Sequence, residues 1–493
     1  MSRKITLAKL ALAHLNLSVQ RTIALSGLWL AAFSLNAAAS ETYQNLSLNQ
    51  AIEIALKNNI EKQISYQSAL IAESQYQQAL SARWPSITLQ AGFQHRDEAP
   101  TFTNPAMNVA LPPAVVFALQ GAASAITVPE QTIKMFNQNT STATLQMLYP
   151  LYTGGKISSI INQAGIGKEV AQEEMRRTSL QVVRDVKRYY YASQLTRELD
   201  ITAKGILSDL NNTRDLTKSL YENGSGSVNK LDYLKTEMAV SYAKSVEIDF
   251  ASKHKAALAA LSNTMGLGWD SLISIETPLS SKTNANPQLD ALVAQAAQFN
   301  PQIGVLKLAV RAADEKINEA RSGYFPQIAL TADTTHYENG YDKGLANGTN
   351  QNSWTIGIGL SLPLFNGFLT EHQVSAAKLQ ANQTQDKQKL VEQGIATLIK
   401  NLLIEYDAAH QQVEVSEQAA KLADDHSDLT SRAFQIGASK AEDMVHASIL
   451  QAISRGNLLR ARHDQQLHLA ELDYVLGAEA QQCHSNRFYW PFC

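Results

Sequence analysis

Two stretches of the sequence, 213 residues apart, carry nearly the same phrase. Residues 148–156 read LYPLYTGGK and residues 361–369 read SLPLFNGFL, which aligns Pro150 with Pro363. The same offset aligns an aromatic residue and a glycine in the later stretches SLYENGSGS and RAFQIGASK. Because the phrase recurs with its downstream context, both copies are expected to build the same local structure.

Upstream of the phrase the offset changes. Pro85 and Pro326 lie 241 residues apart, as do Asn59 and Asn300. The first copy therefore holds an insertion of 28 residues between Pro85 and Pro150. Since each offset is held by more than one pair of residues, the sequence indicates duplication of a large unit rather than a short solenoid repeat.

Each copy predicts the same order of elements: helix, strand, loop, strand, long helix, turn and helix. In the first copy a capping-box pattern at Ser47 begins a helix that we expect to run to about Ala82. Apolar residues then alternate with polar ones, which is the signal of a strand. Four strands are expected, at residues 87–93, 142–149, 328–332 and 354–362.

The repeated phrase lies between a strand and a helix. Proline cannot donate a hydrogen bond to a strand ladder, so Pro150 and Pro363 are expected to end their strands. Gly154 and Gly367 follow them, and glycine permits a tight change of direction. The phrase is therefore predicted to be a strand-to-helix connector, used once in each copy.

Two unusually long segments without proline follow the connectors. Residues 156–222 and 368–435 contain none, and about 67 residues make a helix of roughly 100 Å. Apolar and small residues recur in both at three- and four-residue gaps, as in coiled coils. Gly224 and Gly437 are expected to end these helices, after which a shorter helix returns.

Charge and motif content argue against two classes of protein. The chain carries 42 Lys and Arg against 45 Asp and Glu, a net charge of −3, whereas a nucleic-acid-binding surface is strongly basic. Its 11 histidines are scattered, and no HExxH, CxxC or GxSxG motif is present. We therefore expect no nucleic-acid binding, no enzymatic activity, and no cofactor or metal.

The beginning of the sequence is predicted to be a targeting segment. Residues 1–39 combine early positive charge, an apolar run and small residues at the end, which is typical of a cleaved signal peptide rather than of a membrane anchor. The two repeats are then expected over residues 40–272 and 273–477.

The tail, residues 478–493, holds the two cysteines of the chain, Cys483 and Cys493. In an oxidising compartment they would close a small disulfide loop. The alternative is two unpaired thiols in a tail without fixed structure.

Four strands per chain constrain how the protein assembles. After residue 39 no stretch reaches the roughly 20 apolar residues of a membrane-spanning helix, so an exported chain of this kind is either soluble or crosses a membrane as β-strands. The smallest known membrane barrels have about 8 strands. A membrane role would therefore require oligomerisation: two copies would supply 8 strands and three would supply 12.

The sequence resembles the TolC-like outer membrane efflux protein family over about residues 41–477. The resemblance rests on the duplication, on PLYTGG and PLFNGF after the second strand of each half, on RWPSITL and YFPQIAL at the first strand, and on the tips ENGSGS and QIGASK. It implies an α+β membrane protein: a homotrimer with a 12-stranded β-barrel in the outer membrane and a long α-helical coiled-coil barrel in the periplasm.

The resemblance also implies a function and partners. The protein would be the exit duct of a tripartite efflux or type I secretion system, with a periplasmic adaptor and an inner-membrane pump or ABC exporter. Its cargo stays open among drugs, metals and secreted proteins. The rival interpretation is a soluble periplasmic coiled-coil scaffold or adaptor without a channel, which explains the helices but not four symmetrically placed strands.

In this family a ring of acidic residues narrows the periplasmic end of the tunnel, in a G-[ST]-x-x-x-x-D-V-L-D pattern after the second tip. Asp443 matches the first acidic position, and His446 stands at the second, where it would add a pH dependence because the ordinary histidine pKa is about 6.5. The 213-residue offset makes Lys230 a candidate partner of Asp443. The alternative is that Asp443 only begins a helix, beside a capping box of Ser439 with Glu442.

The two helix tips are expected to contact the adaptor, with an ordinary helical turn as the alternative. The insertion, within residues 95–140, falls in the outward loop between the first two strands, where its apolar sequence either folds over the barrel mouth or has no role. The tip residues are Gly224, Ser225, Ser227, Gly437 and Ser439.

Overall fold

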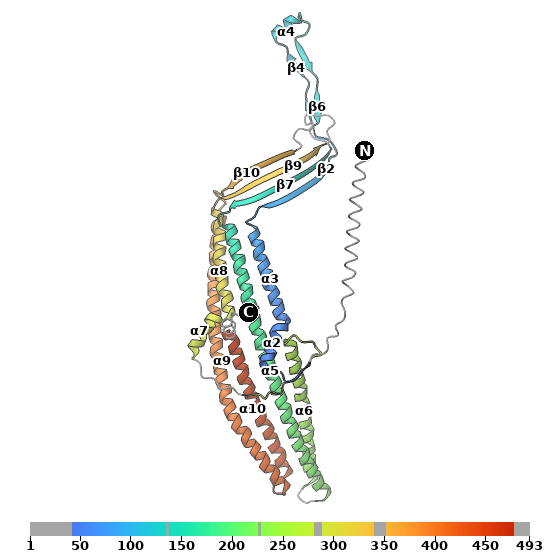
Figure 1. The fold of residues 1–493 in the computed structure, drawn as a ribbon, viewed down its shortest axis with the longest axis vertical. Coiled ribbons are helices and arrows are strands. Elements are labelled where there is room, and N and C mark those ends of the chain that lie inside the picture. The colour runs from blue at the N-terminus through green and yellow to red at the C-terminus, as the bar shows by residue number, and fades with distance from the viewer. Residues whose placement is uncertain (1–41, 135–137, 225–227, 281–287, 340–351, 478–493) are drawn as a thin grey trace.

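The computed structural model describes five stretches of the chain: residues 42–134, 138–224, 228–280, 288–339 and 352–477. The molecule is elongated, with a four-stranded sheet between a long helical body and a projecting arm (Figure 1). The predicted signal peptide, Ser225, Ser227 and the tail with Cys483 and Cys493 lie outside the described residues. None of the described helices is both long and apolar enough to cross a membrane.

The element order of the first half returns in the second, as the duplication predicts. The first-half elements are α2 (Leu48–Asn58), α3 (Ile60–Ser81), β2 (Ser86–His95), β7 (Asn139–Tyr152), α5 (Lys156–Glu222) and α6 (Lys230–Thr264). The second-half elements are α7 (Leu289–Phe299), α8 (Pro301–Arg321), β9 (Gln327–Asn339), β10 (Asn352–Ser361), α9 (Leu369–Gln435) and α10 (Ala441–Leu476), with a 3-10 turn η1 (Ser322–Tyr324) before β9.

The two long helices are confirmed close to their predicted bounds. α5 and α9 have 67 residues each. Gly224 and Gly437 follow their ends with φ of +66° and +74°, a left-handed backbone that glycine adopts without steric cost. α6 and α10 then return along them with 35 and 36 residues.

The opening helix is broken, whereas the sequence predicts one helix from Ser47 to about Ala82. Ser47 does cap α2 in a capping box with Gln50. Asn59, however, has an extended backbone and its side chain caps α3. Its amide also donates to the Thr264 carbonyl at 2.8 Å, so a contact from 205 residues away fixes the break.

The second half repeats this joint. Asn300 caps α8, which begins at Pro301, and its amide donates to the Val475 carbonyl at 2.7 Å. Gly477 follows α10 so closely against the Phe299 carbonyl that a side chain there would clash. The end of each shorter helix is therefore fastened to the break in each opening helix.

The main sheet has the order β10-β9-β7-β2, and all its pairs are antiparallel. Cross-strand partners place apolar side chains on one face and mainly polar ones on the other, as the alternation predicts. The apolar face is uncovered: Ile87, Leu89, Ile356 and Ile358 are between 65% and 70% exposed. Its two outer strands, β2 and β10, each have one unpaired edge.

Pro150 does not end its strand, contrary to the prediction. β7 continues to Tyr152, with a bulge between Pro150 and Tyr152 in its ladder with β9. The ladder with β2 already stops at Leu148, so the missing N–H of the proline costs no bond on that side. Pro363, by contrast, lies beyond β10, which ends at Ser361.

The insertion folds as a two-stranded arm, where the sequence predicts only an outward loop (Figure 1). The described residues hold six short strands besides the four that were predicted. These strands are β1 (Thr42–Tyr43), β3 (Thr101–Asn104), β4 (Met107–Ala110), β5 (Ala125–Val128), β6 (Gln131–Lys134) and β8 (Leu272–Ile273), and one short helix, α4 (Pro113–Ala118), lies between β4 and β5. β1 pairs with β8 near the first joint, and the others form the arm.

The helical body consists of two levels, one next to the sheet and one at the far end, and at each level the helices lie side by side in a row. Next to the sheet, neighbours touch in the order α3–α5–α8–α9, and at the far end in the order α6–α5–α10–α9. Two apolar cores hold the middle, one of them around Val186 and Leu261 and the other around Ile399 and Leu476. α5 and α9 belong to both rows, so they tie the two levels together.

Gly154→Ala is expected to lower the Tm more than Gly367→Ala. Both glycines have a left-handed φ, +62° and +65°, so both changes carry a cost of about 1–2 kcal/mol. A Cβ at Gly154 would also lie 2.6 Å from the Phe325 Cβ, whereas Gly367 has nothing within 4 Å. This overpacking adds about 1–3 kcal/mol. Thermal unfolding followed by circular dichroism checks the difference, and equal shifts would contradict it.

Candidate functional site

The candidate site is the far end of the helical body, where α5 turns into α6 and α9 turns into α10 (Figure 1). The Asp232 carboxylate accepts from the Asn229 N–H at 3.1 Å. In the second turn the Asp443 carboxylate accepts from the Lys440 N–H and the Ser439 hydroxyl, both at 3.0 Å. These bonds lower the pKa of Asp443, and the bond from the Lys440 backbone has the larger effect.

Asp443 therefore corresponds to Asp232 and not to Lys230. Lys230 is the first residue of α6, and Ala441 holds that place in α10. The first turn is two residues longer than the second, so the offset between the halves falls from 213 to 211 past the tips. Within the chain, Asp443 thus makes the contacts of a residue that begins a helix, which was the alternative given above.

Glu442 joins the two tips. Its carboxylate accepts from the Lys235 ammonium at 2.9 Å, and this hydrogen bond is the main reason why the pKa of Glu442 is lowered. The predicted capping box is wrong, because Ser439 binds Asp443 instead. The predicted ion pair of Lys230 with Asp443 is not formed within the chain either, since Asp443 is held in its own helix cap.

His446 lies on the surface one turn into α10. Its side chain is 74% exposed, and its Nε2 lies 3.9 Å from the Glu442 carboxylate. Tyr221 and Tyr233 stack near the other tip, with ring centroids 6.3 Å apart. The end of the second hairpin therefore gathers two carboxylates and an imidazole at the surface.

The two uncovered edges of the helical body were not predicted from the sequence. α6 ends one side of the lower row and α9 ends the other. Both expose apolar residues at helical spacing, a pattern that a partner helix normally covers. These stripes are Leu231, Leu234 and Met238 on α6, and Val415, Leu422 and Leu429 on α9. The seven-residue spacing on α9 is a signal that the sequence contains.

The upper end of the row has a similar edge. α3 contains no buried residue, although Ile60, Ile64 and Ile71 recur on it at helical spacing and are 57–65% exposed. α3 packs on α5 through partly buried residues only, so these three isoleucines stay uncovered within the chain.

An apolar groove of about 460 Å³ lies between α5, α6 and α10, in the lower part of the helical body above the tips. Tyr242, Phe250 and Ile453 line it together with Leu199. It lies where the α5–α6 hairpin meets α10 of the other hairpin, so a bound segment would touch both hairpins.

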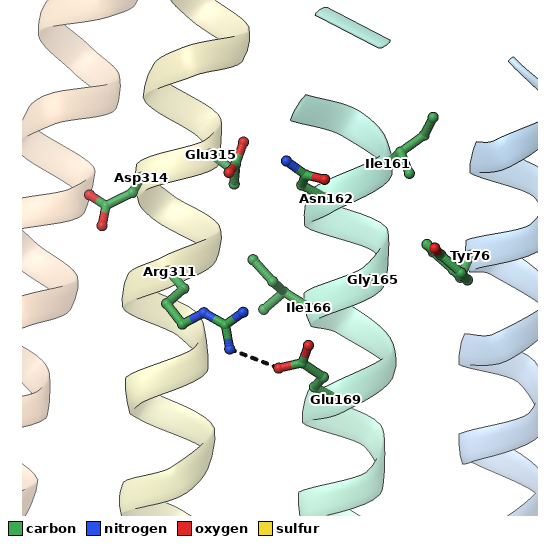
Figure 2. Close-up of a pocket in the computed structure, with 9 residues that line it drawn as sticks. All are labelled: Tyr76, Ile161, Asn162, Gly165, Ile166, Glu169, Arg311, Asp314 and Glu315. Carbon is green, nitrogen blue, oxygen red and sulfur yellow. Dashed lines mark hydrogen bonds and ion pairs between the residues drawn. The ribbon is translucent and has the colours of Figure 1, made fainter. Parts of the chain in front are cut away.

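A polar pocket lies higher, between α3, α5 and α8 (Figure 2). Arg311 donates to the Glu169 carboxylate at 2.8 Å, and Tyr76 lies against Gly165, where a Cβ would come within 3.4 Å of the ring. These contacts hold the three helices together. Among the described residues, no cluster of three or more His, Cys, Asp or Glu side chains is arranged to hold a metal ion.

Comparison with known families and sequences gives one family. The family described as outer membrane efflux protein matches residues 51–267 and 292–478. Outer membrane protein TolC of Salmonella enteritidis is 21% identical over 206 residues, which are 41% of this chain and 42% of that protein. The toluene efflux pump outer membrane protein TtgC of Pseudomonas putida is 23% identical over 291 residues, 59% of each chain. The chain thus matches about two to three fifths of the length of these relatives.

Solved structures with the same fold match most of the chain. The outer membrane protein VceC of Vibrio cholerae has a TM-score of 0.67 at 18% identity and covers 87% of this chain and 96% of its own. The CmeC outer membrane channel of Campylobacter jejuni has a TM-score of 0.70 at 14% identity and covers 90% of both. At these identities the likeness shows the shared fold.

Proposed function

The chain belongs to the outer membrane efflux protein family, and from this premise we propose that it forms a homotrimeric channel in the outer membrane with its helical body in the periplasm. The channel is the exit duct of a tripartite efflux or type I secretion system and passes small molecules or proteins to the exterior. It works with a periplasmic adaptor and an inner-membrane pump or ABC exporter. Each repeat, residues 40–272 and 273–477, supplies two strands of the barrel.

The observation that carries this proposal is the uncovered apolar face of the sheet. On three of its strands Leu89, Leu145 and Ile356 share that face and are 69%, 45% and 66% exposed. A contiguous apolar face of this kind marks contact with a membrane or a partner. In a barrel of twelve strands from three copies, this face meets lipid and the polar face lines the channel.

The uncovered edges support a closed ring. β2, α3 and α6, all from the first half, lie on one side of the chain, and β10 and α9, from the second half, lie on the other. In a ring, the first-half edge of one copy meets the second-half edge of the next. This contact is heterologous, and such contacts make closed rings when the rotation closes.

We propose further that the tips narrow the periplasmic end of the channel. Three copies of Asp443 and Glu442 around one axis would repel anions and attract cations, and His446 adds an imidazole beside them. The adaptor contacts the tips, including Gly224, Gly437 and Ser439, and the apolar groove between the hairpins. Connectors at Pro150, Gly154, Pro363 and Gly367 join barrel and tunnel.

Glu442→Gln is expected to raise the single-channel conductance at pH 7, because it removes the ion pair that links the two tips. The pKa of Glu442 is lowered in the folded protein. The stabilising effect of the pair is therefore present above the ordinary glutamate pKa and is lost only as pH falls through the lowered pKa. The ion pair should accordingly persist between pH 8 and pH 5, and the wild-type conductance should not rise over that range.

Lys244→Gln is the matched control, since Lys244 is also on α6 but pairs with Glu247 of the same helix. Lys235→Gln should reproduce the effect of Glu442→Gln, and the double variant should add nothing further. Equal conductance changes in Lys244→Gln and Lys235→Gln would show that the pair between the tips does not restrain the opening.

The proposed function is tested with the full-length protein expressed in a Gram-negative host. We expect release from outer membranes only by detergent, a trimer mass in detergent, and discrete conductance steps in planar lipid bilayers. Recovery as a soluble periplasmic protein would contradict the proposal and favour the scaffold alternative. A photo-reactive residue in place of Ser439 then distinguishes an adaptor captured with a pump from one captured with an ABC exporter.

A further inference from the structure

The arm beyond the sheet is a continuation of the β2–β7 hairpin. Ser86 pairs with Leu148 at the base of the hairpin and Ala110 with Ala125 near the tip of the arm, with one residue of register shift between them. Figure 1 shows the arm rising from the sheet on the side opposite the helical body. β2 is an outer strand of the sheet, so the arm begins where the next copy of the proposed ring is joined.

The arm carries no charge over most of its length. The 31 residues from 99 to 129 contain no Asp, Glu, Lys, Arg or His, in a chain in which 18% of residues are charged. Its tip is apolar as well: Phe117 on α4 is 88% exposed. An exposed surface segment without charges is unusual, because charges keep such segments soluble and apart from one another.

One face of the arm is apolar and the other is polar. On the polar face the Thr127 hydroxyl donates to the Asn108 side-chain oxygen at 2.7 Å. On the opposite face Met107, Val109 and Ile126 are 46–56% exposed. The arm face, as we name it, consists of two cross-strand pairs, Met107 with Val128 and Val109 with Ile126.

A second copy of the chain fits this face better than lipid does. A ribbon of two strands has two open edges, whose N–H and C=O groups would be unpaired in hydrocarbon, and its second face is polar. At a rotation axis identical side chains meet, so any charge would meet its like. The absence of charge from 99 to 129 removes this repulsion between copies.

We infer that the arms of the copies pack on one another through the arm face and the Phe117 tip. Arms that rise from a ring can all meet only above its axis, so their contact covers the outer mouth of the channel. The inference rests on the proposed ring, and its tests are chosen so that the two can fail separately.

Cysteine cross-linking tests the contact, in full-length protein with Cys483→Ser and Cys493→Ser. Val109→Cys lies on the arm face, and Asn108→Cys, the next residue of the same strand, lies on the polar face. After oxidation with copper phenanthroline, Val109→Cys should yield at least tenfold more covalent dimer than Asn108→Cys. Similar yields at both positions, or no dimer at either, would overturn the inference.

A second pair of cysteines reports on the ring itself. Leu234→Cys on α6 and Leu429→Cys on α9 lie on the two uncovered edges at the same end of the body. If a short bis-maleimide links this pair between copies while Val109→Cys gives no dimer, the ring stands and the contact between arms is wrong. If neither links, the proposed function fails too.

Two further measurements decide between partners and test the effect on the mouth. An environment-sensitive dye on Val109→Cys should keep its emission when phosphatidylcholine vesicles are added; a blue shift with vesicles would overturn the inference in favour of lipid. Replacing residues 99–129 by a two-residue turn should raise the conductance in planar bilayers several-fold. Unchanged conductance would overturn the covering of the mouth.

Discussion

Ile356→Lys is expected to keep the protein from inserting into the outer membrane, whereas Thr355→Lys is not. Ile356 lies on the apolar face of β10 with Trp354 and Ile358, and all three are at least 66% exposed. In the proposed barrel this face meets lipid, where a lysine near the bilayer midplane costs about 2–4 kcal/mol. Three copies triple that cost, which corresponds to several orders of magnitude in the equilibrium for insertion.

Thr355→Lys is the control because adjacent residues of a strand point to opposite faces. Its ammonium would face the water-filled channel and stay hydrated. The measurement is the amount of protein in purified outer membranes, with helix content checked by circular dichroism of the detergent-extracted fraction. Equal losses for the two variants would mean that the apolar face does not meet lipid.

The long helices are the part of the fold that the sequence predicts best. Their ends are marked by residues with local physical effects: proline before α5 and α9, and the left-handed Gly224 and Gly437 after them. Between these signals apolar and small residues recur at three- and four-residue spacing over parts of each helix, as at 199–210 and 391–413. Both signals are local in sequence, so no knowledge of the tertiary structure is needed to read them.

The joints at Asn59 and Asn300 show where local patterns are insufficient. The apolar pattern continues across Asn59. The break in the helix becomes favourable because the side-chain amide of Asn59 donates a hydrogen bond to the Thr264 carbonyl. That partner belongs to a helix whose position depends on the whole first half. The sequence nonetheless repeats an asparagine at both places, with Pro301 beside the second, and proline is well suited to the first position of a new helix.

The predicted pair of Lys230 with Asp443 differs from the contacts within the single chain for a different reason. The prediction applied the 213-residue offset on both sides of the turn. Because the turn differs in length between the halves, this offset aligned Lys230 with Asp443. Once the helix caps are used as the reference, Asp232 and Asp443 align. The actual pair, Lys235 with Glu442, depends on how the two hairpins pack, which the repeat alone does not determine.

The strands of the arm could not be predicted from the sequence. Its strands β4 and β5 have four residues each, too few for alternation to stand out from the apolar background. Prolines at 105, 112 and 113 interrupt the segment further. The readable feature is the loss of charge from 99 to 129, which indicates an unusual surface but not its structure.

Leu422→Glu is expected to abolish trimer formation while leaving the single chain folded. Leu422 is 68% exposed in the chain and lies between Val415 and Leu429 on the uncovered stripe of α9. In the proposed ring that stripe is covered by the next copy, and a buried carboxylate without a partner costs several kcal/mol. The ring contains three such contacts, so the cost applies three times to each assembly.

Lys421→Glu is the matched control. It changes the charge at the neighbouring exposed position of α9, which lies about 100° around the helix from Leu422 and so away from the stripe. Mass measurement in detergent should show trimers for Lys421→Glu and only single chains for Leu422→Glu, with equal helix content. Export, measured as resistance to pump substrates, should be lost together with the trimer. A Leu422→Glu protein that is still trimeric would place the contact between copies elsewhere than on the edge of α9.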